Sequence, residues 1–222
     1  MPYPGGNVAS WVGICTNVGS YIHMPQYFDN AEYANEKSYT YDFSFNGKKY
    51  RLLGATGTFN KGGFDEGTRF LLETIVNLDL GKNILDIGCG VGPIGLILAS
   101  ADSSRHITMS DVNLRALALA KENVEFAGVS SQCEIISSDV YSSINSVYDT
   151  IVSNPPIHAG KKVTYRIYDE SVEHLKEGGS LIIVIRKQQG ALSVKEHLIS
   201  IFNNKVEVLD RHKGYYVIKA TK

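Results

Sequence analysis

Two short runs of residues have the types and spacing that chemistry on a bound small molecule requires. The first lies between Asp86 and Gly95 and carries glycines at positions 88, 90, 92 and 95. The second is Asn154-Pro155-Pro156-Ile157-His158. Glycines let a backbone turn sharply and approach a ligand where any Cβ would clash. Two successive prolines remove two N–H donors, so the Pro155 carbonyl can face a substrate without a competing donor beside it.

The glycine-rich run alone fits more than one ligand. Its spacing matches the dinucleotide fingerprint, and a tight turn with Asp86 capping the next helix is the structural alternative. A carboxylate at Asp86 would repel a pyrophosphate but could bind a cationic ligand through its amino group or through water. Asp111 ends the next strand, where it can accept hydrogen bonds from both hydroxyls of a ribose. A ligand with a ribose, a positive amino-acid end and no phosphate is S-adenosylmethionine.

A third segment, Ser137-Ser138-Asp139-Val140, follows another strand pattern. Asp139 can accept a hydrogen bond from an adenine amine, while Val140 offers a backbone N–H. The alternative is a simple helix cap or turn.

Asn154-Pro155-Pro156 suits the acceptor side of a methyl transfer. Methylation of an amine conjugated to a ring requires its nitrogen lone pair to be drawn out of the ring system and aligned with the methyl–sulfur bond. The Asn154 side-chain oxygen and the Pro155 carbonyl can accept the two amine hydrogens and hold the nitrogen in line. Such orientation contributes up to ~7–11 kcal/mol in well-aligned systems. His158 could relay the released proton, or could simply be a polar loop residue.

The elements around these runs are expected to bring them together. Apolar segments near 83–88, 106–110, 133–137, 148–153 and 180–186 alternate with helical patterns near 92–100, 113–127, 164–177 and 190–202. This alternation predicts an α/β, Rossmann-like fold with a mostly parallel sheet and helices on both faces. Ligands bind at the carboxyl ends of strands in such folds, so both runs are expected at one edge of the sheet.

Hairpin patterns precede and follow this core. Alternating aromatic residues flank Asn46-Gly47 within residues 38–53, which is a strong hairpin signal. A similar pattern around Lys213-Gly214 predicts that the terminal strand enters the sheet antiparallel. Residues 1–28 contain no acidic or basic side chain. We interpret residues 1–23 as a leader that is expression-derived or disordered, with Met24 as the native start, and residues 24–58 as an N-terminal hairpin extension.

Composition excludes several classes of protein. A formal net charge of -1 excludes a bulk polycation that binds nucleic acid through global charge. The three cysteines are far apart and no Cys/His cluster has metal-ligand spacing, so we expect no metal and reduced thiols in a cytoplasmic protein. The N-terminal segment lacks the unbroken apolar run of a signal peptide or membrane span, and no membrane partner is expected. We expect a monomer or weak oligomer.

The ordered motifs resemble class I S-adenosylmethionine-dependent methyltransferases, and more closely the family of ribosomal RNA small subunit methyltransferase C. The resemblance covers roughly residues 25–222, with the methyltransferase domain over 59–222. The matching stretches are Phe59 to Thr68, Asp86 to Gly95, Asp111-Val112-Asn113, Ser138-Asp139, Asn154 to His158 and Gly214 to Lys219.

The resemblance implies a central seven-stranded sheet with one antiparallel strand, and methylation of guanine N2 in small-subunit ribosomal RNA. It also implies that residues 59–68 close over the cofactor, with Asp65 and Thr68 near its amino-acid end. The expected cofactor-binding residues are Asp65, Thr68, Asp86, Gly88, Cys89, Gly90, Gly92, Asp111, Val112, Asn113, Asp139, Val140 and Asn154.

Two features depart from the family pattern. Ile157 stands where amine methyltransferases with this motif usually place an aromatic ring that stacks on the target. Phe59, Tyr165 and Tyr168 are candidates to replace that ring, and its loss weighs against adenine and protein-glutamine substrates. The founding enzyme also carries an extra N-terminal domain that helps to recognise RNA, whereas only a hairpin is evident here.

Scattered basic residues are expected to converge beyond the strand ends. A basic rim there would position RNA phosphates, although ordinary solvated surface charge is the alternative. Together with Phe59, the expected substrate-binding residues are Lys61, Lys161, Lys162, Arg166, Arg186 and Lys187.

Other functions stay open at this point. The acceptor could be another amine, of adenine, of a protein glutamine or of a small molecule. The glycine spacing also permits a nicotinamide-dependent oxidoreductase, but no hydride-side catalytic set or second substrate domain is evident. A non-catalytic RNA-binding module is the third alternative, against which the intact Asn154-Pro155-Pro156 run argues.

Overall fold

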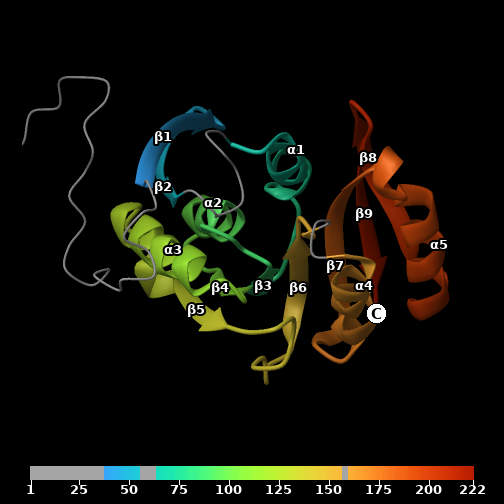
Figure 1. The fold of residues 1–222 in the computed structure, drawn as a ribbon. Helices are drawn as coiled ribbons and strands as arrows, with labels where there is room; N and C mark the ends of the chain where they lie inside the picture. The colour runs from blue at the N-terminus through green and yellow to red at the C-terminus, as the bar shows by residue number, and fades with distance from the viewer. Residues whose placement is uncertain (1–37, 56–63, 157–159) are drawn as a thin grey trace, which may run out of the picture.

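The computed structural model describes residues 38–55, 64–156 and 160–222. The predicted leader, Phe59, Lys61 and His158 lie outside these ranges. A seven-stranded sheet forms the centre of the molecule (Figure 1), in the order β5-β4-β3-β6-β7-β9-β8. The strands are β3 (Asn83–Ile87), β4 (His106–Asp111), β5 (Cys133–Ser137), β6 (Tyr148–Ser153), β7 (Leu175–Arg186), β8 (Val206–His212) and β9 (Tyr215–Thr221).

The strand directions confirm the Rossmann-like prediction. Neighbouring strands from β5 through β7 are parallel, while β9 runs antiparallel to both β7 and β8. The chain builds outward from β3 to β5, then returns to the other side of β3 as β6. The carboxyl ends of β3 and β6 therefore flank the point where the strand order reverses, which is where open α/β sheets bind ligands.

Helices cover both faces of the sheet, as predicted. Side chains alternate along each strand, so Ile84 packs with α1 (Glu66–Ile75), α2 (Pro93–Ala101) and α3 (Leu114–Phe126). The next residue, Leu85, packs on the opposite face with α4 (Lys161–Asp169) and α5 (Ala191–Ile201). The same alternation recurs at Val152 and Ile151. Two apolar layers therefore cover the two faces of the sheet.

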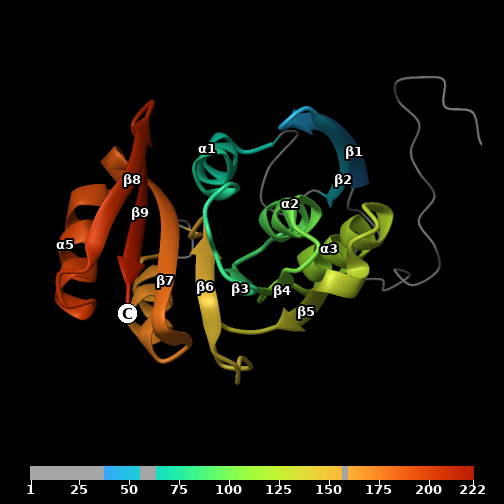
Figure 2. The same ribbon diagram turned by 180° about the vertical axis from the view of Figure 1, so that it is seen from behind.

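The N-terminal hairpin is confirmed and packs beside the glycine-rich turn. β1 (Ser38–Phe45) and β2 (Lys48–Ala55) are joined by Asn46 and Gly47, both at positive φ. Figures 1 and 2 show the hairpin against α2 and α3, away from α5. The buried Asn123 of α3 donates to the carbonyls of Leu53 (3.1 Å) and Val91 (2.9 Å), and accepts from Leu53 N (2.7 Å). One side chain therefore ties the hairpin, α3 and the turn together.

One element departs from the prediction. The helix expected at 164–177 ends at Asp169, a short 3-10 turn covers Glu170–Val172, and β7 begins at Leu175. The glycines at 178 and 179 are not a helix end. They lie in a bulge of β7, where the pairing with β6 shifts. A Cβ at Gly179 would come within 3.0 Å of three backbone carbonyl oxygens, so this close approach requires glycine.

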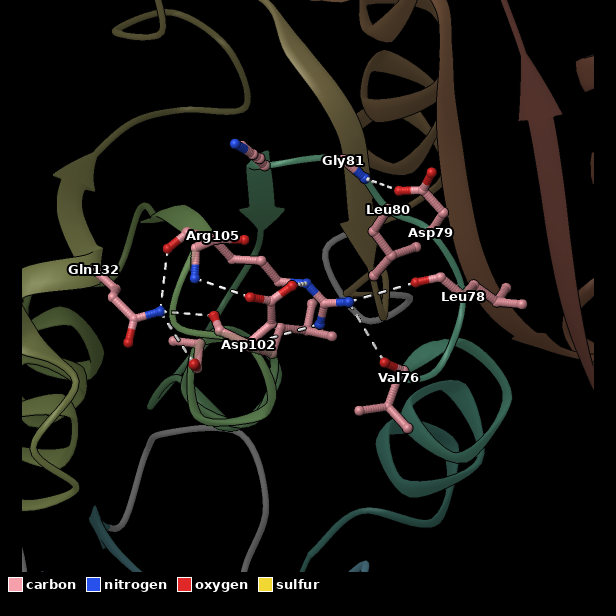
Figure 3. A network of polar contacts seen from close by, with 12 residues as sticks. Val76, Leu78, Asp79, Leu80, Gly81, Asp102, Arg105 and Gln132 are labelled. Carbon is pink, nitrogen blue, oxygen red and sulfur yellow. Dashed lines mark hydrogen bonds and ion pairs between the residues drawn. The ribbon is translucent and has the colours of Figure 1, made fainter.

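A buried arginine secures the helix ends at the edge of the sheet opposite the strands' carboxyl ends. Arg105 donates to the carbonyls of Leu78 (3.4 Å) and Val76 (3.5 Å), as Figure 3 shows, and to that of Leu98 (3.3 Å). These oxygens lie at or just beyond the ends of α1 and α2, where helix carbonyls lack partners. Gln132 reinforces the same loop by donating to three further carbonyls. The network stabilises the scaffold and lies away from the predicted site.

No helix among the described residues is long and apolar enough to cross a membrane.

Candidate functional site

The glycine-rich turn is hydrogen-bonded to the end of β4. Gly88 N and Cys89 N both donate to the Ser110 carbonyl, at 2.8 and 2.9 Å. The Asp111 carboxylate accepts from Gly90 N (2.9 Å) with one oxygen and from Asn113 N (2.9 Å) with the other. Each carboxylate oxygen has two lone pairs, so Asp111 retains acceptor capacity for a ligand's hydroxyl groups. Gly88 and Gly90 both adopt positive φ, which only glycine does without strain.

A pocket of about 480 Å³ opens above this turn. It reaches from the ends of β3 and β4 to the segment after β5, the run after β6 and the inner side of α4. Its described lining residues are Thr68, Ile87, Gly88, Cys89, Gly90, Val91, Pro93, Ile94, Ser110, Asp111, Val112, Asn113, Ala116, Ser138, Asp139, Val140, Asn154, Pro156, Val163 and Ile167. The glycine turn and the Asn154 run thus share one cavity.

Direct contacts between β3 and β6 set the distance between the two runs. Ser153 Oγ donates to the Ile87 carbonyl at 2.8 Å. A Cβ placed on Gly88 would lie 3.7 Å from Pro156 Cδ. The two predicted halves of the site are therefore in van der Waals reach of each other.

Three predicted cofactor residues lie outside the pocket wall. Gly92 begins α2 at φ +89°, and a Cβ there would come 2.4 Å from Met109 Cε, so its glycine serves packing against β4. Asp86 is fully buried beneath the turn. Asp65 precedes α1 and contacts Asn154 instead.

Asp86 is an uncommon buried acid. Its Oδ2 accepts from Gly95 N at 3.0 Å, whereas its Oδ1 has no hydrogen-bond partner in the described part of the chain. Burial raises the pKa of Asp86 to about 7, the hydrogen bond from Gly95 opposes the shift, and the Asp111 carboxylate adds to it. An orphaned carboxylate oxygen beneath the turn is suited to a cation or a water above it.

Cys89 is not equipped to act as a nucleophile. Burial raises the pKa of its thiol well above the usual value, and the carboxylates of Asp86 and Asp111 add to the shift. The thiol form is therefore favoured, and Cys89 forms part of the apolar wall.

Asn154 is held from the N-terminus of α1. Its Nδ2 donates to Asp65 Oδ2 at 2.8 Å and to Thr68 Oγ1 at 3.0 Å. Asp65 is also the N-cap of α1, because the same Oδ2 accepts from Thr68 N at 2.7 Å. Thr68 and Asn154 both line the pocket. Asp65 and Thr68, from the segment expected to close over the cofactor, thus contact Asn154, the residue proposed to hold the target amine.

The segment after β5 carries a strained residue. Val140 has φ +54°, which is rare for a β-branched side chain. The Ser138 hydroxyl donates to the Val140 carbonyl at 2.8 Å and holds this conformation. Backbone strain of about 1–3 kcal/mol persists where surrounding contacts enforce it, commonly at ligand sites. This geometry is compatible with the predicted adenine contacts of Asp139 and Val140.

Arg166 is engaged by two acids. Its Nη1 lies 3.0 Å from Asp139 Oδ2 and its Nε lies 2.8 Å from Glu170 Oε1. Hydrogen bonds to Glu170 and to Asp139 raise the pKa of the Arg166 guanidinium. The structure thus gives Arg166 a place beside the predicted adenine end of the pocket, bridging α4 and the segment after β5.

The other described basic residues differ in their surroundings. Lys161 and Lys162 are exposed at the start of α4, directly after the Asn154 run. Lys187 is exposed after β7. Arg186 lies over the Tyr215 ring, with its Cζ 4.6 Å from the ring centroid. Arg186 is the last residue of β7, and the three lysines follow the carboxyl ends of β6 and β7.

Neither described candidate for the missing stacking ring lies at the pocket. Tyr168 is fully buried, so it cannot stack on a substrate base. Tyr165 packs against His197, with ring centroids 4.6 Å apart, and does not line the pocket. Sequence reasoning also missed Val163 and Ile167, which supply the apolar wall from α4. Their i, i+4 spacing marks one helix face, but only the fold shows what that face covers.

Comparison with known proteins finds a matching family model and similar proteins. A family model described as methyltransferase small domain matches residues 49–219. An uncharacterized protein of Bacillus subtilis, YbxB, is 41% identical over 88% of this chain and 98% of its own length. Ribosomal RNA small subunit methyltransferase C of Vibrio parahaemolyticus is 33% identical over 92% of this chain and 58% of its own length. The chain therefore spans little more than half of that longer relative.

Solved structures show the same fold. A T. thermophilus 16S rRNA N2 guanine methyltransferase, solved with AdoMet and guanosine, aligns with a TM-score of 0.74 at 23% identity, covering 83% of this chain and 50% of that one. A ribosomal protein L11 methylase from Lactobacillus delbrueckii aligns with a TM-score of 0.60 at 17% identity, covering 72% and 80%.

Proposed function

Because this chain belongs to the methyltransferase small domain family, we propose that it transfers the methyl group of S-adenosylmethionine to an exocyclic amine, guanine N2 of small-subunit ribosomal RNA. One observation carries the proposal. A single pocket is lined by Gly88 and Gly90 of the turn, by Asp111, and by Asn154 and Pro156. A donor held by the turn and an amine held by the Asn154 run can therefore meet.

The pocket's chemistry fits this cofactor. Asp111 and Asp139 line it, and no Lys or Arg is among its described lining residues. Such a wall suits a ligand with hydroxyl groups and a positive charge, and it suits a pyrophosphate poorly. The volume of about 480 Å³ lies within the usual range for cofactor sites. This acidic lining favours S-adenosylmethionine over a nicotinamide dinucleotide.

The chain's own residues are proposed to bind the cofactor and to orient the target amine. Asp111 accepts the ribose hydroxyls, and Asp139 with the Val140 N–H faces the adenine. Asn154 Oδ1 and the Pro155 carbonyl accept the two hydrogens of the target amine and turn its lone pair toward the donor. The cofactor supplies an electrophilic methyl group when bound. Catalysis is then mainly alignment of reacting atoms about 3–3.5 Å apart, and the amine proton leaves to solvent.

The RNA substrate is proposed from two observations. Relatives that are 33% identical over 92% of this chain and 39% identical over 58% of it are named ribosomal RNA small subunit methyltransferase C. Lys161, Lys162 and Lys187 are exposed and follow the carboxyl ends of β6 and β7 in the chain, a position from which we expect them to contact phosphates. Action on ribosomal RNA would place the protein in the cytoplasm.

The proposal is tested by labelled methyl transfer. The protein is incubated with labelled S-adenosylmethionine and with ribosomal RNA or small subunits from a strain that lacks the gene, and nucleosides are then analysed. Label in N2-methylguanosine is expected. Label in N6-methyladenosine or in protein would contradict the substrate proposal, and no transfer to any amine would contradict the activity.

The RNA surface has a separate test. Lys161→Ala with Lys162→Ala is expected to weaken RNA binding and to lower its dependence on salt concentration, because fewer counterions are released. Cofactor affinity should stay unchanged. Lys82→Ala with Lys205→Ala is the matched control, since both side chains are exposed at the opposite edge of the sheet. An equal salt dependence in the two double variants would contradict the proposed surface.

A further inference from the structure

In the part of the chain that the structure describes, the Asn154 side chain bonds to two groups, the N-cap of α1 and a side chain of its first turn. Nδ2 lies 2.8 Å from Asp65 Oδ2 and 3.0 Å from Thr68 Oγ1. Asp65 lies 89 residues before Asn154 in the sequence. Asp65 does not line the pocket, whereas Asn154 does. Asp65 is therefore placed to act on the pocket through Asn154.

A carboxamide has two different ends, and only one of them suits an amine substrate. Its oxygen accepts hydrogen bonds, and its NH₂ group donates them. A target amine whose hydrogens must be held needs the oxygen. If the NH₂ group faced the pocket, two donors would oppose each other and the amine would not be held.

Asp65 decides which end faces the substrate. An ionised carboxylate only accepts hydrogen bonds, so the end of Asn154 that meets Asp65 must be its NH₂ group. The amide oxygen then faces away from Asp65. The Thr68 hydroxyl cannot make this selection, because a hydroxyl both donates and accepts.

We propose that Asp65 is a positioning residue whose carboxylate fixes the orientation of the Asn154 amide and so presents its oxygen to the acceptor amine. This role rests on the proposed function. It differs from the contact with the cofactor's amino-acid end that the family resemblance implied. It also differs from a purely structural role as the N-cap of α1.

Substitution by serine separates the two roles of Asp65. Serine caps helices about as well as aspartate, so Asp65→Ser should keep α1 stable. Its hydroxyl ends one bond short of the Asp65 oxygen that meets Asn154. We expect kcat to fall by about ten- to a hundred-fold, as for other misaligned sites. The KM for S-adenosylmethionine and for RNA should stay near wild type.

Substitution by asparagine is the conservative rescue. In the structure one oxygen, Asp65 Oδ2, accepts from both Thr68 N and Asn154 Nδ2. Asparagine can place its single oxygen there, so Asp65→Asn should recover most of the kcat lost in Asp65→Ser. A cap role alone would leave both variants active. An unchanged kcat in Asp65→Ser, an equal loss in both variants, or a raised cofactor KM instead of a lowered kcat would each overturn the proposal.

A double-variant cycle tests the same contact without relying on the serine variant. Asn154→Asp places a second carboxylate against that of Asp65. The two carboxylates can then contact each other only when they share one proton, which is bound more readily at low pH. This variant should therefore have a lower kcat and a lower pH optimum. Adding Asp65→Asn leaves a single carboxylate at the contact, so no proton has to be shared and the pH optimum should return toward that of the wild type. A pH optimum in the double variant that stays where Asn154→Asp puts it contradicts the proposal. Absence of methyl transfer by the wild-type protein would instead contradict the proposed function itself.

Discussion

The buried carboxyl group of Asp86 is expected to make the stability of the free protein fall as pH rises toward neutrality. Its pKa is raised to about 7 by burial, against an opposing hydrogen bond from Gly95. In the unfolded chain the pKa returns to about 3.9. Between these values the folded state binds more protons than the unfolded state, so raising the pH disfavours folding. Below about pH 4 and above about pH 7 this group adds no further slope.

The size of the effect follows from the width of that window. One pH unit inside it corresponds to about 1.4 kcal/mol for a single proton. From pH 5 to pH 7, ionisation of Asp86 should therefore lower the free energy of unfolding by about 2–3 kcal/mol. Asp86→Asn removes the titration and keeps an acceptor for Gly95 N, so this variant should lose that part of the pH dependence.

Urea unfolding at several pH values between 5 and 8 measures the effect. The unfolding free energy of Asp86→Asn minus that of the wild type should rise by about 2–3 kcal/mol from pH 5 to pH 7. Asp210→Asn, which removes an exposed carboxylate on β8, is the control for a simple loss of charge. A difference between Asp86→Asn and wild type that is the same at every pH would refute the reasoning.

Two further substitutions probe packing and the adenine end of the pocket. Gly95→Ala would place a Cβ 2.7 Å from Met109 Cγ and Sδ, so it should lower the unfolding free energy by about 1–3 kcal/mol, as overpacking does. Equal stability in urea would contradict this. Arg166→Ala removes the bridge to Asp139 and should weaken S-adenosylmethionine binding several-fold in calorimetry, with Arg166→Lys recovering part of it. Unchanged affinity in Arg166→Ala would show that the bridge does not position Asp139.

Features set by local residue types were predictable from the sequence. Asn46-Gly47 encodes a two-residue turn between alternating strands, and the structure places both residues at positive φ. The parallel sheet followed from alternating apolar and helical segments, because each crossover needs a helix to return the chain. The prediction placed the end of the helix too late, at residue 177, because a glycine pair can mark either a helix end or a strand bulge. Pairing with β6 decides between them, and that is a tertiary contact.

In the candidate site, too, local features were predictable and tertiary contacts were not. Asp111, Asp139 and Asn154 were predicted at the carboxyl ends of the strands because each ends or follows a strand, and all three line the pocket. The partner of Arg166 was not predictable, since its Asp139 contact joins residues 27 apart on different elements. The Asp65 contact to Asn154 was hidden for the same reason. A sequence shows which groups can bond, but the fold selects the partners.

A crystal structure of the protein with S-adenosylhomocysteine and guanosine tests the central claim most directly. We predict that the ribose hydroxyls contact Asp111, that the sulfur faces the Asn154 run, and that the guanine N2 amine donates to Asn154 Oδ1 and the Pro155 carbonyl. A cofactor whose sulfur points away from Asn154, or a guanosine amine held by other groups, would contradict it.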